Sequence, residues 1–153
     1  MMKYVTADIT EALKNGDVRV IAHQANCFNT MNSGVAKAIR EAFPEAYKAD
    51  CKTAKGDIKK LGGFSVAMTS EHGLIYNLYG QYRYGYSGEK HTDYVALRLS
   101  LQSMAHDLRH RGCLGPIGIP KLGCGLGGGV WEGEVELIVS QTLRDWDVIV
   151  YQI

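Results

Sequence analysis

Residues 117–131 read IGIPKLGCGLGGGVW, a short apolar run that ends in a glycine-rich loop. The segment that follows, Glu132 to Leu143, has the apolar spacing of a helix. A strand, a glycine loop and a helix in this order are typical of backbone that binds phosphate. Glycine lets N–H groups come close to an anion, and the start of a helix adds a favourable dipole. The glycine loop by itself leaves a flexible loop without a ligand open as the alternative.

The whole chain alternates between strand-like and helix-like segments. The expected strands are residues 3–7, 18–23, 62–68, 74–79, 117–119 and 148–153, with a turn near residues 71–73. The expected helices are residues 10–14, 35–43, 44–53, 93–111 and 132–143. Thr92 is the expected N-cap of the fourth helix, with Asp93 in its first turn. This alternation predicts one domain over residues 1–153, an α/β fold built as a three-layer α/β/α sandwich with a mixed, mostly parallel central sheet.

Three polar loops that contain glycine each follow a predicted strand. They are residues 24–34, 80–91 and 123–131. Ligands of open α/β sheets bind beyond the carboxyl ends of the strands, so we expect these loops to gather at one edge of the sheet. Their common position favours a phosphate-binding site over three unrelated flexible loops.

The charge balance of the chain limits its partners. There are 17 Lys and Arg residues against 16 Asp and Glu residues, a formal net charge of +1. This gives no basic field for duplex nucleic acid, so nucleotide recognition has to come from loops and backbone. No apolar run approaches the ~20 residues that span a membrane, and the N-terminus lacks a signal region. The four cysteines have no metal-ligand spacing, which predicts reduced thiols in a cytoplasmic protein without metal or cofactor.

The common phosphate-binding motifs, GxxxxGK[ST] and an early GxGxxG, are absent from the chain. Its own pattern consists of Ala7-Asp8-Ile9-Thr10, then Ala22–Asn26 followed by Asn32–Ala36, and finally Ile119–Gly128. These segments resemble, in this order, the GDIT turn and the two phosphate loops of the macro domain family, whose members bind ADP-ribose. His23, the segment 76–81 and the Gly-Cys-Gly-Leu loop are most similar to a subgroup of ADP-ribose-1''-phosphate phosphatases and terminal ADP-ribose glycohydrolases.

The resemblance implies a role for each part of the site. Asp8 would accept the adenine amino group beside the Ile9 N–H, although an Asp that caps the following helix is the alternative. Asn26 would hydrogen-bond the distal ribose, although an Asx-turn is common at such a position. The whole implied ligand-binding set is Asp8, Ile9, Asn26, Asn32, Ser33, Gly34, Val35, Ala36, Gln81, Tyr82, Gly123, Cys124, Gly125, Leu126, Gly127 and Gly128.

The resemblance also implies two catalytic residues, His23 and Asn26. His23 is expected at a strand end, where its titration range suits proton transfer, and Asn26 with the loop amides would orient water. A His23 that only hydrogen-bonds loop backbone and shapes the site stays open. Cys27 and Cys124 are expected for their small size rather than as nucleophiles.

The chain departs from its relatives at positions that matter for chemistry. Members of the subgroup that the chain resembles usually carry an acid in the second loop, at the position of either Gly127 or Val130 in this chain. The terminal glycohydrolases that the chain resembles use a lysine in the loop after the fourth strand. Residues 79–83 hold no lysine, and Arg83 cannot replace one because arginine stays protonated. A covalent lysine mechanism is therefore disfavoured. Glu89 or Asp93 is left as a possible source of a carboxylate.

Two functions from different classes therefore stay open. The first is a hydrolase that acts at the distal ribose of ADP-ribose-1''-phosphate or of an ester-linked ADP-ribosyl group. The second is a module that binds ADP-ribose without turnover. The expected partners are ADP-ribose, ADP-ribose-1''-phosphate and ADP-ribosylated macromolecules, with no membrane and no duplex nucleic acid.

Overall fold

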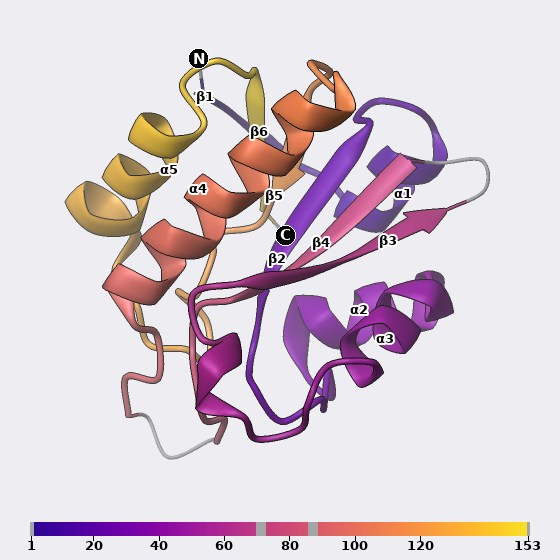
Figure 1. Cartoon of the computed structure of the whole chain (residues 1–153). Coiled ribbons are helices and arrows are strands. Elements are labelled where there is room, and N and C mark those ends of the chain that lie inside the picture. Colours follow the sequence, from indigo (N-terminus) through magenta and orange to yellow (C-terminus); the bar gives the residue numbers. More distant parts are fainter. Residues whose placement is uncertain (1, 70–72, 86–88, 153) are drawn as a thin grey trace.

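The computed structural model describes residues 2–69, 73–85 and 89–152, and in them six strands form one sheet (Figure 1). The strands are β1 (Met2–Thr6), β2 (Val20–Ala25), β3 (Phe64–Thr69), β4 (Gly73–Tyr79), β5 (Ile117–Ile119) and β6 (Val148–Gln152). Their order is β1-β6-β5-β2-β4-β3, in which only β3 and β4 pair antiparallel. The predicted mixed, mostly parallel sheet is confirmed.

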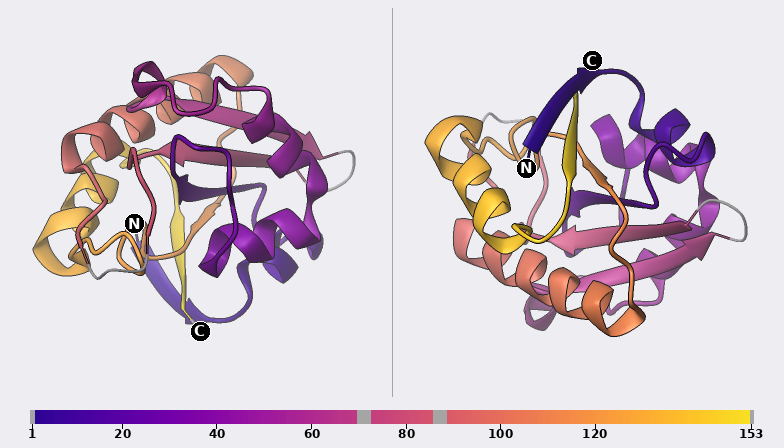
Figure 2. Two further views of the ribbon diagram at one scale, coloured as in Figure 1. Left: turned by 90° about the horizontal axis from the view of Figure 1, so that it is seen from below. Right: turned by 90° about the horizontal axis from the view of Figure 1, so that it is seen from above.

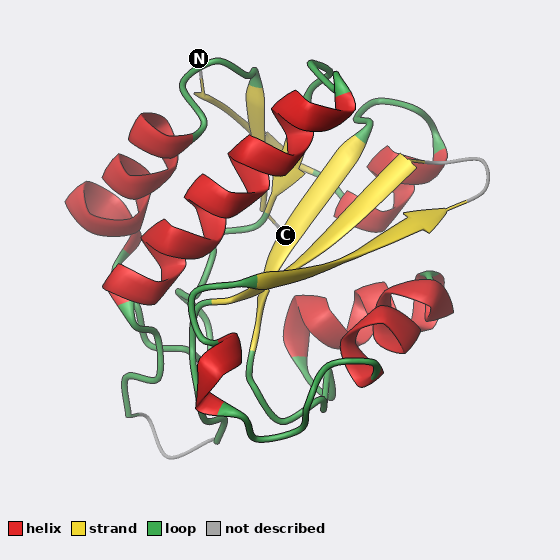
Figure 3. Cartoon of the chain, in the orientation of Figure 1, coloured by secondary structure: helices red, strands yellow, loops and turns green. Residues whose placement is uncertain are grey.

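Helices cover both faces of this sheet (Figures 1 and 3). They are α1 (Ile9–Lys14), α2 (Gly34–Ala42), α3 (Pro44–Cys51), the short 3-10 helix η1 (Ile58–Lys60), α4 (Tyr94–Arg111) and α5 (Glu136–Thr142). Helices α4 and α5 lie on one face, and α1, α2 and α3 lie on the other. Figure 2 shows β1 beside β6, near the two ends of the chain. Within the described ranges, no helix combines the length and apolar character needed to cross a membrane.

The core has two layers because side chains of a strand alternate between faces. Val20 and Ala22 of β2 belong to the cluster under α4 and α5. Ile21 lies between them in sequence and belongs to the cluster under α1 to α3. Leu97 and Leu101 of α4 are fully buried, as their helical spacing predicted. The sandwich is therefore held by apolar packing on both faces of one sheet.

Strand β2 ends two residues later than the sequence predicted. Its pairing with β4 continues to the partners Ala25 and Tyr79, so the predicted end at residue 23 is wrong. His23 lies inside the strand opposite Asn77 rather than at a strand end beside the loop. The long pairing with β4, which no local pattern revealed, carries His23 into the interior.

The N-cap of α4 is Asp93, and the prediction of Thr92 for this role is wrong. The Asp93 carboxylate accepts a hydrogen bond from the Ala96 N–H at 3.0 Å. The Thr92 hydroxyl instead donates to the carbonyl oxygen of Gly123 at 2.7 Å. Two adjacent residues could each cap this helix, and the nearby glycine loop determines which one does. The helix ends at Arg111, followed by Gly112 in the left-handed conformation, as predicted.

The helix expected over residues 132–143 is shorter than predicted. Glu132 has an extended backbone and Gly133 has φ +76°, so Trp131–Val135 forms an irregular wide turn, η2. The regular helix α5 begins only at Glu136. The glycine loop therefore does not run directly into a helix start, and the helix dipole expected there is not available. Of the turn expected near residues 71–73, residues 71 and 72 lie outside the described residues, and Gly73 begins β4.

Candidate functional site

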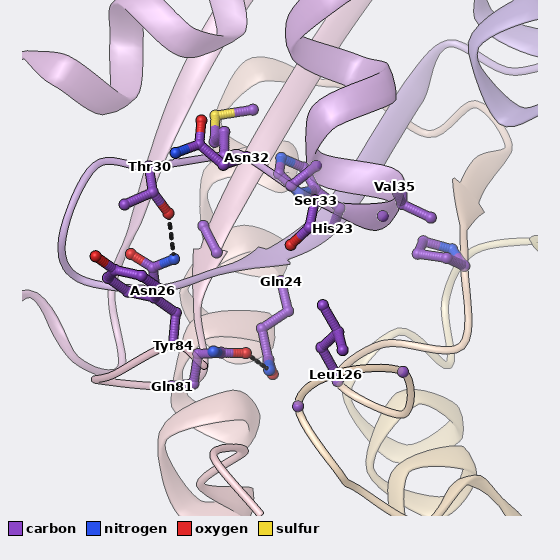
Figure 4. A pocket seen from close by; sticks show the side chains of 18 of the residues that line it. His23, Gln24, Asn26, Thr30, Asn32, Ser33, Val35, Gln81, Tyr84 and Leu126 are labelled. Atoms are coloured by element: carbon purple, nitrogen blue, oxygen red, sulfur yellow. Dashed lines mark hydrogen bonds between the residues drawn. The ribbon is translucent and has the colours of Figure 1, made fainter. Parts of the chain in front are cut away.

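A pocket of about 300 Å³ lies at the carboxyl ends of β2, β4 and β5 (Figure 4). It brings together residues of all three predicted loops, which gather below the sheet in Figure 3. The predicted site residues that line it are His23, Asn26, Asn32, Ser33, Gly34, Val35, Ala36, Gln81, Gly123, Gly125, Leu126 and Gly127. The predicted residues that do not line it are Asp8, Ile9, Tyr82, Cys124 and Gly128.

The first wall of the pocket is the start of α2. Ser33 precedes this nine-residue helix, and its side chain makes no capping hydrogen bond. The N–H groups of the first helical turn, at Gly34, Val35 and Ala36, therefore have no partner within the helix or its cap. Unpaired N–H groups at a helix start, with the helix dipole behind them, attract anions.

The loop before α2 is held by Arg40. Its guanidinium donates to the Thr30 carbonyl at 2.9 Å and to the Asn32 side-chain oxygen at 2.8 Å. Its own plane lies over the Tyr47 ring, 3.6 Å from the centroid. This arginine organises the wall from outside, since it does not line the pocket.

The glycine loop forms the opposite wall. It is closed on itself by the bonds from Gly129 N–H to the Gly123 carbonyl at 2.7 Å and from Gly128 N–H to the Gly125 carbonyl at 3.1 Å. The N–H groups of Gly125, Leu126 and Gly127 donate to no acceptor among the described residues. The pocket thus lies between two sets of unpaired backbone amides, the arrangement that accommodates anionic groups without net charge.

Packing explains why Gly127 carries no acid. A Cβ atom there would lie 2.5 Å from the Thr92 hydroxyl oxygen and 2.7 Å from the Gly123 carbonyl oxygen. The Gly127 carbonyl also accepts the N–H groups of His91 and Thr92, at 2.7 and 3.0 Å. Val130, the other position at which the resemblance implies an acid, does not line the pocket. The glycine loop of this chain therefore has no room for a side chain at Gly127.

Gln24 connects the walls at the floor of the pocket. Its amide nitrogen donates to the Gln81 side-chain oxygen at 2.6 Å, drawn in Figure 4, and to the Thr92 hydroxyl at 2.9 Å. Gln81 in turn donates to the Arg83 carbonyl at 2.6 Å. The predicted ligand residue Gln81 is therefore also a structural link between two loops.

Asn26 forms the Asx-turn that the sequence left open. Its side-chain oxygen accepts the Phe28 N–H at 2.8 Å, and its amide donates to the Thr30 hydroxyl at 2.7 Å (Figure 4). Tyr84 lines the pocket, whereas the Tyr82 hydroxyl points away and donates to the Gly56 carbonyl at 2.7 Å. Tyr84 rather than Tyr82 therefore places an aromatic ring against the pocket.

His23 is held in one tautomer by Asn77. The Asn77 amide nitrogen donates to the Ala46 carbonyl at 3.0 Å, so its oxygen must face His23 Nε2, 2.6 Å away. The imidazole consequently donates through Nε2–H, and its Nδ1 has no hydrogen-bond partner. Burial lowers the pKa of His23 to about 4. A proton shuttle alternates between neutral and protonated forms, and a pKa of about 4 disfavours the protonated form of His23 at pH 7.

Asp8, Ile9 and the two loop cysteines lie off the pocket or serve the fold. Asp8 caps α1, accepting the Thr10 N–H at 2.9 Å and the Thr10 hydroxyl at 2.7 Å. These hydrogen bonds, from the hydroxyl and then from the backbone, lower the pKa of Asp8.

Burial raises the pKa of Cys27 and of Cys124 to about 11, which agrees with the packing role expected of both. Among the described residues, no three His, Cys, Asp or Glu side chains could together hold a metal ion.

Comparison with known proteins identifies the family. A sequence model described as Macro domain matches residues 22–138. The chain belongs to the macro domain family. An uncharacterized 17.5 kDa protein from the tk-vs intergenic region of Enterobacteria phage T4 is 32% identical over 157 residues, which cover 96% of this macro domain and 97% of the phage protein.

Solved structures agree with this macro domain fold. A macrodomain protein from Streptomyces coelicolor superposes with a TM-score of 0.74 at 25% identity, over 100% of this chain and 99% of that one. Thermosipho africanus DarTG in complex with ADP-ribose superposes with a TM-score of 0.76 at 17% identity, over 98% of this chain and 41% of that one.

Sequence reasoning missed several residues that line the pocket of this macro domain. They are Gln24, Ala25, Thr30, Met31, Asp50, Gly85, Pro120 and Lys121. All of them except Asp50 lie inside the motif segments or polar loops that the sequence indicated, but no role was assigned to them there. Asp50 is the exception, because it comes from α3 and belongs to no motif. Glu89 and Asp93, which the sequence offered as possible sources of a carboxylate, do not line the pocket.

Proposed function

We propose that this macro domain binds ADP-ribose or ADP-ribose-1''-phosphate in the pocket between the start of α2 and the glycine loop. The observation that carries the proposal is the pair of facing walls with unpaired N–H groups, at Gly34–Ala36 and at Gly125–Gly127. The oxygens of a diphosphate between these walls would accept hydrogen bonds from the N–H groups on both sides. Lys121 is the only Lys or Arg among the described residues that line the pocket, so backbone amides would supply most of the recognition.

Further observations favour ADP-ribose over a simple phosphate. The pocket volume of about 300 Å³ suits a ligand larger than an inorganic anion. Asp8 follows β1, which runs parallel to its neighbours, so it lies at the same sheet edge, where an adenine could extend beyond the pocket. The DarTG structure with a similar fold contains ADP-ribose. The proposed ligand therefore spans the pocket and reaches towards Asp8.

We further propose hydrolysis at the distal ribose, of ADP-ribose-1''-phosphate or of an ADP-ribosyl ester on a macromolecule. In this proposal Asn26 and the loop amides orient water, and His23 shapes the site as a neutral imidazole rather than as the proton shuttle. A non-catalytic ADP-ribose-binding module is the second candidate, favoured by the low pKa of His23 and by the absence of an acid at Gly127. A reducing compartment such as the cytoplasm is part of the proposal because all four cysteines are free thiols.

Calorimetry with the Gly125→Glu variant tests the site. A Cβ at Gly125 meets open space and its backbone is not left-handed, so the variant is expected to fold. Its carboxylate would enter the anion path and weaken ADP-ribose binding by roughly tenfold or more, about 1.4 kcal/mol. Gly125→Gln, of similar size without the charge, is the matched control and should bind more tightly than Gly125→Glu.

The outcomes separate the candidates. No binding of ADP-ribose by the wild-type protein would refute the proposal as a whole. Equal affinities of Gly125→Glu and the wild type would refute the placement of the phosphates. Clear binding with no turnover of ADP-ribose-1''-phosphate and of an ester-linked ADP-ribosyl peptide over several hours would support the binding module.

A further inference from the structure

Asp50 is a buried carboxylate at the pocket that none of the contacts described so far explains. It lies near the end of α3, is 0% exposed, and forms part of the pocket wall. It is the only Asp or Glu among the described residues that line this pocket. A buried carboxylate is costly unless its oxygens are paired, so its presence calls for a physical reason.

One oxygen of Asp50 is firmly anchored. The Tyr79 hydroxyl donates to Oδ1 at 2.6 Å, and the same hydroxyl lies 2.8 Å from the Ser65 hydroxyl. Ser65 in turn accepts from the Asn77 amide at 3.0 Å, and Asn77 holds His23. Asp50 therefore stands at the end of a buried hydrogen-bonded chain that fixes its position.

The other oxygen of Asp50 has no partner. Oδ2 is buried and makes no hydrogen bond within the described residues. The charge is also only partly balanced, since the Lys60 ammonium donates to Asn29 at 2.6 Å and to Thr53 at 2.7 Å rather than to Asp50. An acceptor that is held rigidly and left unpaired beside a pocket is suited to a water or a ligand hydroxyl.

The groups around Asp50 leave it as the local proton acceptor. Burial raises the pKa of Asp50, against the lowering effect of the Tyr79 hydrogen bond and of Lys60. The other nearby titratable groups, Cys27 and Tyr47, also have raised pKa values and stay neutral at pH 7. A carboxylate with a raised pKa is a stronger base than an exposed one.

We propose that Asp50 is the catalytic base of the hydrolase proposed above, with Oδ2 holding the attacking water. The water oxygen forms a bond to C1'' of the distal ribose while the bond from C1'' to the ester oxygen breaks. The water proton passes to Oδ2, and the ester departs as a carboxylate. The products are ADP-ribose and a free carboxylate, and Asp50 returns its proton to solvent. This inference rests on the proposed function of the site.

The same arrangement selects between the two reactions considered. A carboxylate leaves C1'' without needing a proton, whereas attack of water on the phosphorus of ADP-ribose-1''-phosphate expels the sugar oxygen, which needs one. The neutral His23 and the cysteines with raised pKa values offer no ready proton at pH 7. The site therefore favours hydrolysis of ADP-ribosyl esters of acidic side chains over attack on the phosphorus of ADP-ribose-1''-phosphate.

The test compares Asp50→Asn with Asp107→Asn in the full chain. Asp107 accepts from the Tyr76 hydroxyl at 2.5 Å, so it forms the same kind of Tyr–Asp pair, and it does not line the pocket. We expect Asp50→Asn to keep ADP-ribose affinity within about threefold and to lose about 100-fold or more in ester hydrolysis. Asp107→Asn should keep both. The wild-type rate should rise with pH as Asp50 loses its proton, with a midpoint above the ordinary range of a carboxylate, and the residual Asp50→Asn rate should not.

Tyr79→Phe is the second variant, for the case that Asp50→Asn does not fold. Loss of the hydroxyl that positions Oδ1 should lower the rate by roughly tenfold at unchanged ADP-ribose affinity. Wild-type rates in both Asp50→Asn and Tyr79→Phe would overturn the role of Asp50, as would loss of ADP-ribose binding in Asp50→Asn. A wild-type protein that binds ADP-ribose but hydrolyses no ester would overturn both this role and the hydrolase, whereas a wild-type protein that does not bind would overturn the proposed function itself.

Discussion

Hydrogen bonding inside the sheet determines the chemistry of His23. Asn77 fixes the Nε2–H tautomer from one side, and the surrounding side chains leave the imidazole 1% exposed. Charging it in place would require a second proton on a ring with almost no solvent contact, which is why burial lowers its pKa to about 4. At the residue scale, the environment keeps the residue most suited to proton transfer in its neutral form at pH 7.

This environment makes the stability of the protein depend on pH. The pKa of His23 is lowered from 6.5 to about 4, so the unfolded chain takes up the proton first as the pH falls. The stability contributed by His23 is fully present above pH 6.5 and is lost progressively between pH 6.5 and about 4, by about 3 kcal/mol in total. Urea unfolding across this range should show that loss in the wild type.

The His23→Gln variant lacks the titrating group, so its free energy of unfolding should fall less steeply over the same pH range. His106→Gln, which changes an exposed histidine of α4, is the matched control and should follow the wild type. Parallel pH profiles for the wild type and His23→Gln would contradict the buried neutral imidazole.

The glycine loop is shaped at the scale of one element by contact rather than by flexibility. The Gly123 carbonyl accepts from the Thr92 hydroxyl, and the Gly127 carbonyl accepts from the N–H groups of His91 and Thr92. Within the loop, the hydrogen bond from the Gly129 N–H to the Gly123 carbonyl closes a tight ring. The glycines of this loop therefore have different reasons for being glycine. Gly123 has φ +69° and Gly127 has no space for a Cβ, whereas Gly125 meets neither limit.

Alanine substitutions at Gly127 and Gly125 should distinguish a glycine required for lack of space from one that is not. Gly127→Ala would push a Cβ to within 2.5 Å of the Thr92 hydroxyl oxygen. We expect a loss of about 1–3 kcal/mol in the free energy of unfolding, measured with urea. Gly125→Ala should change it by less than about 0.5 kcal/mol, because its Cβ meets open space. An equally small effect of both substitutions would show that the loop adapts to added side chains.

At the scale of the whole molecule, the site exists because parallel strands end at one edge. Gln24 lies near the end of β2, Gln81 follows β4, and the glycine loop follows β5. The hydroxyl of Thr92 accepts from Gln24 at 2.9 Å and donates to Gly123 at 2.7 Å, which joins elements far apart in sequence. Removing this hydroxyl should loosen the loops relative to one another without unfolding the sheet.

Thr92→Val tests this coupling. We expect amide hydrogen exchange at His91 and Gly129, whose N–H groups bond to the glycine loop, to become about tenfold faster or more. Exchange in the central strands should stay unchanged. Thr142→Val removes a buried hydroxyl that bonds the Ile138 carbonyl at 2.8 Å within α5, away from the pocket, and is the control. Unchanged exchange at His91 and Gly129 in Thr92→Val would show that the loops hold their positions independently.

Much of this architecture could be predicted from local patterns. Apolar periodicity indicated the strands and helices, and their alternation indicated the sandwich, since both signals depend on neighbours along the chain. The boundaries that were wrong depend on contacts across space. Gly133 with φ +76° shortened a helix that its apolar spacing had favoured, and the carbonyl of Gly123 engaged Thr92, which left the cap to Asp93.

The sequence by itself determined the kind of site. The motifs around Asn26, Ser33 and the glycine loop indicated the macro domain family, because backbone that approaches an anion needs small residues at particular positions. The tertiary structure decided which ionisable groups could act there. Protonation depends on burial and on partners brought from distant segments, so only the folded chain shows His23 neutral beside Asn77 and Asp50 with one unpaired oxygen at the pocket.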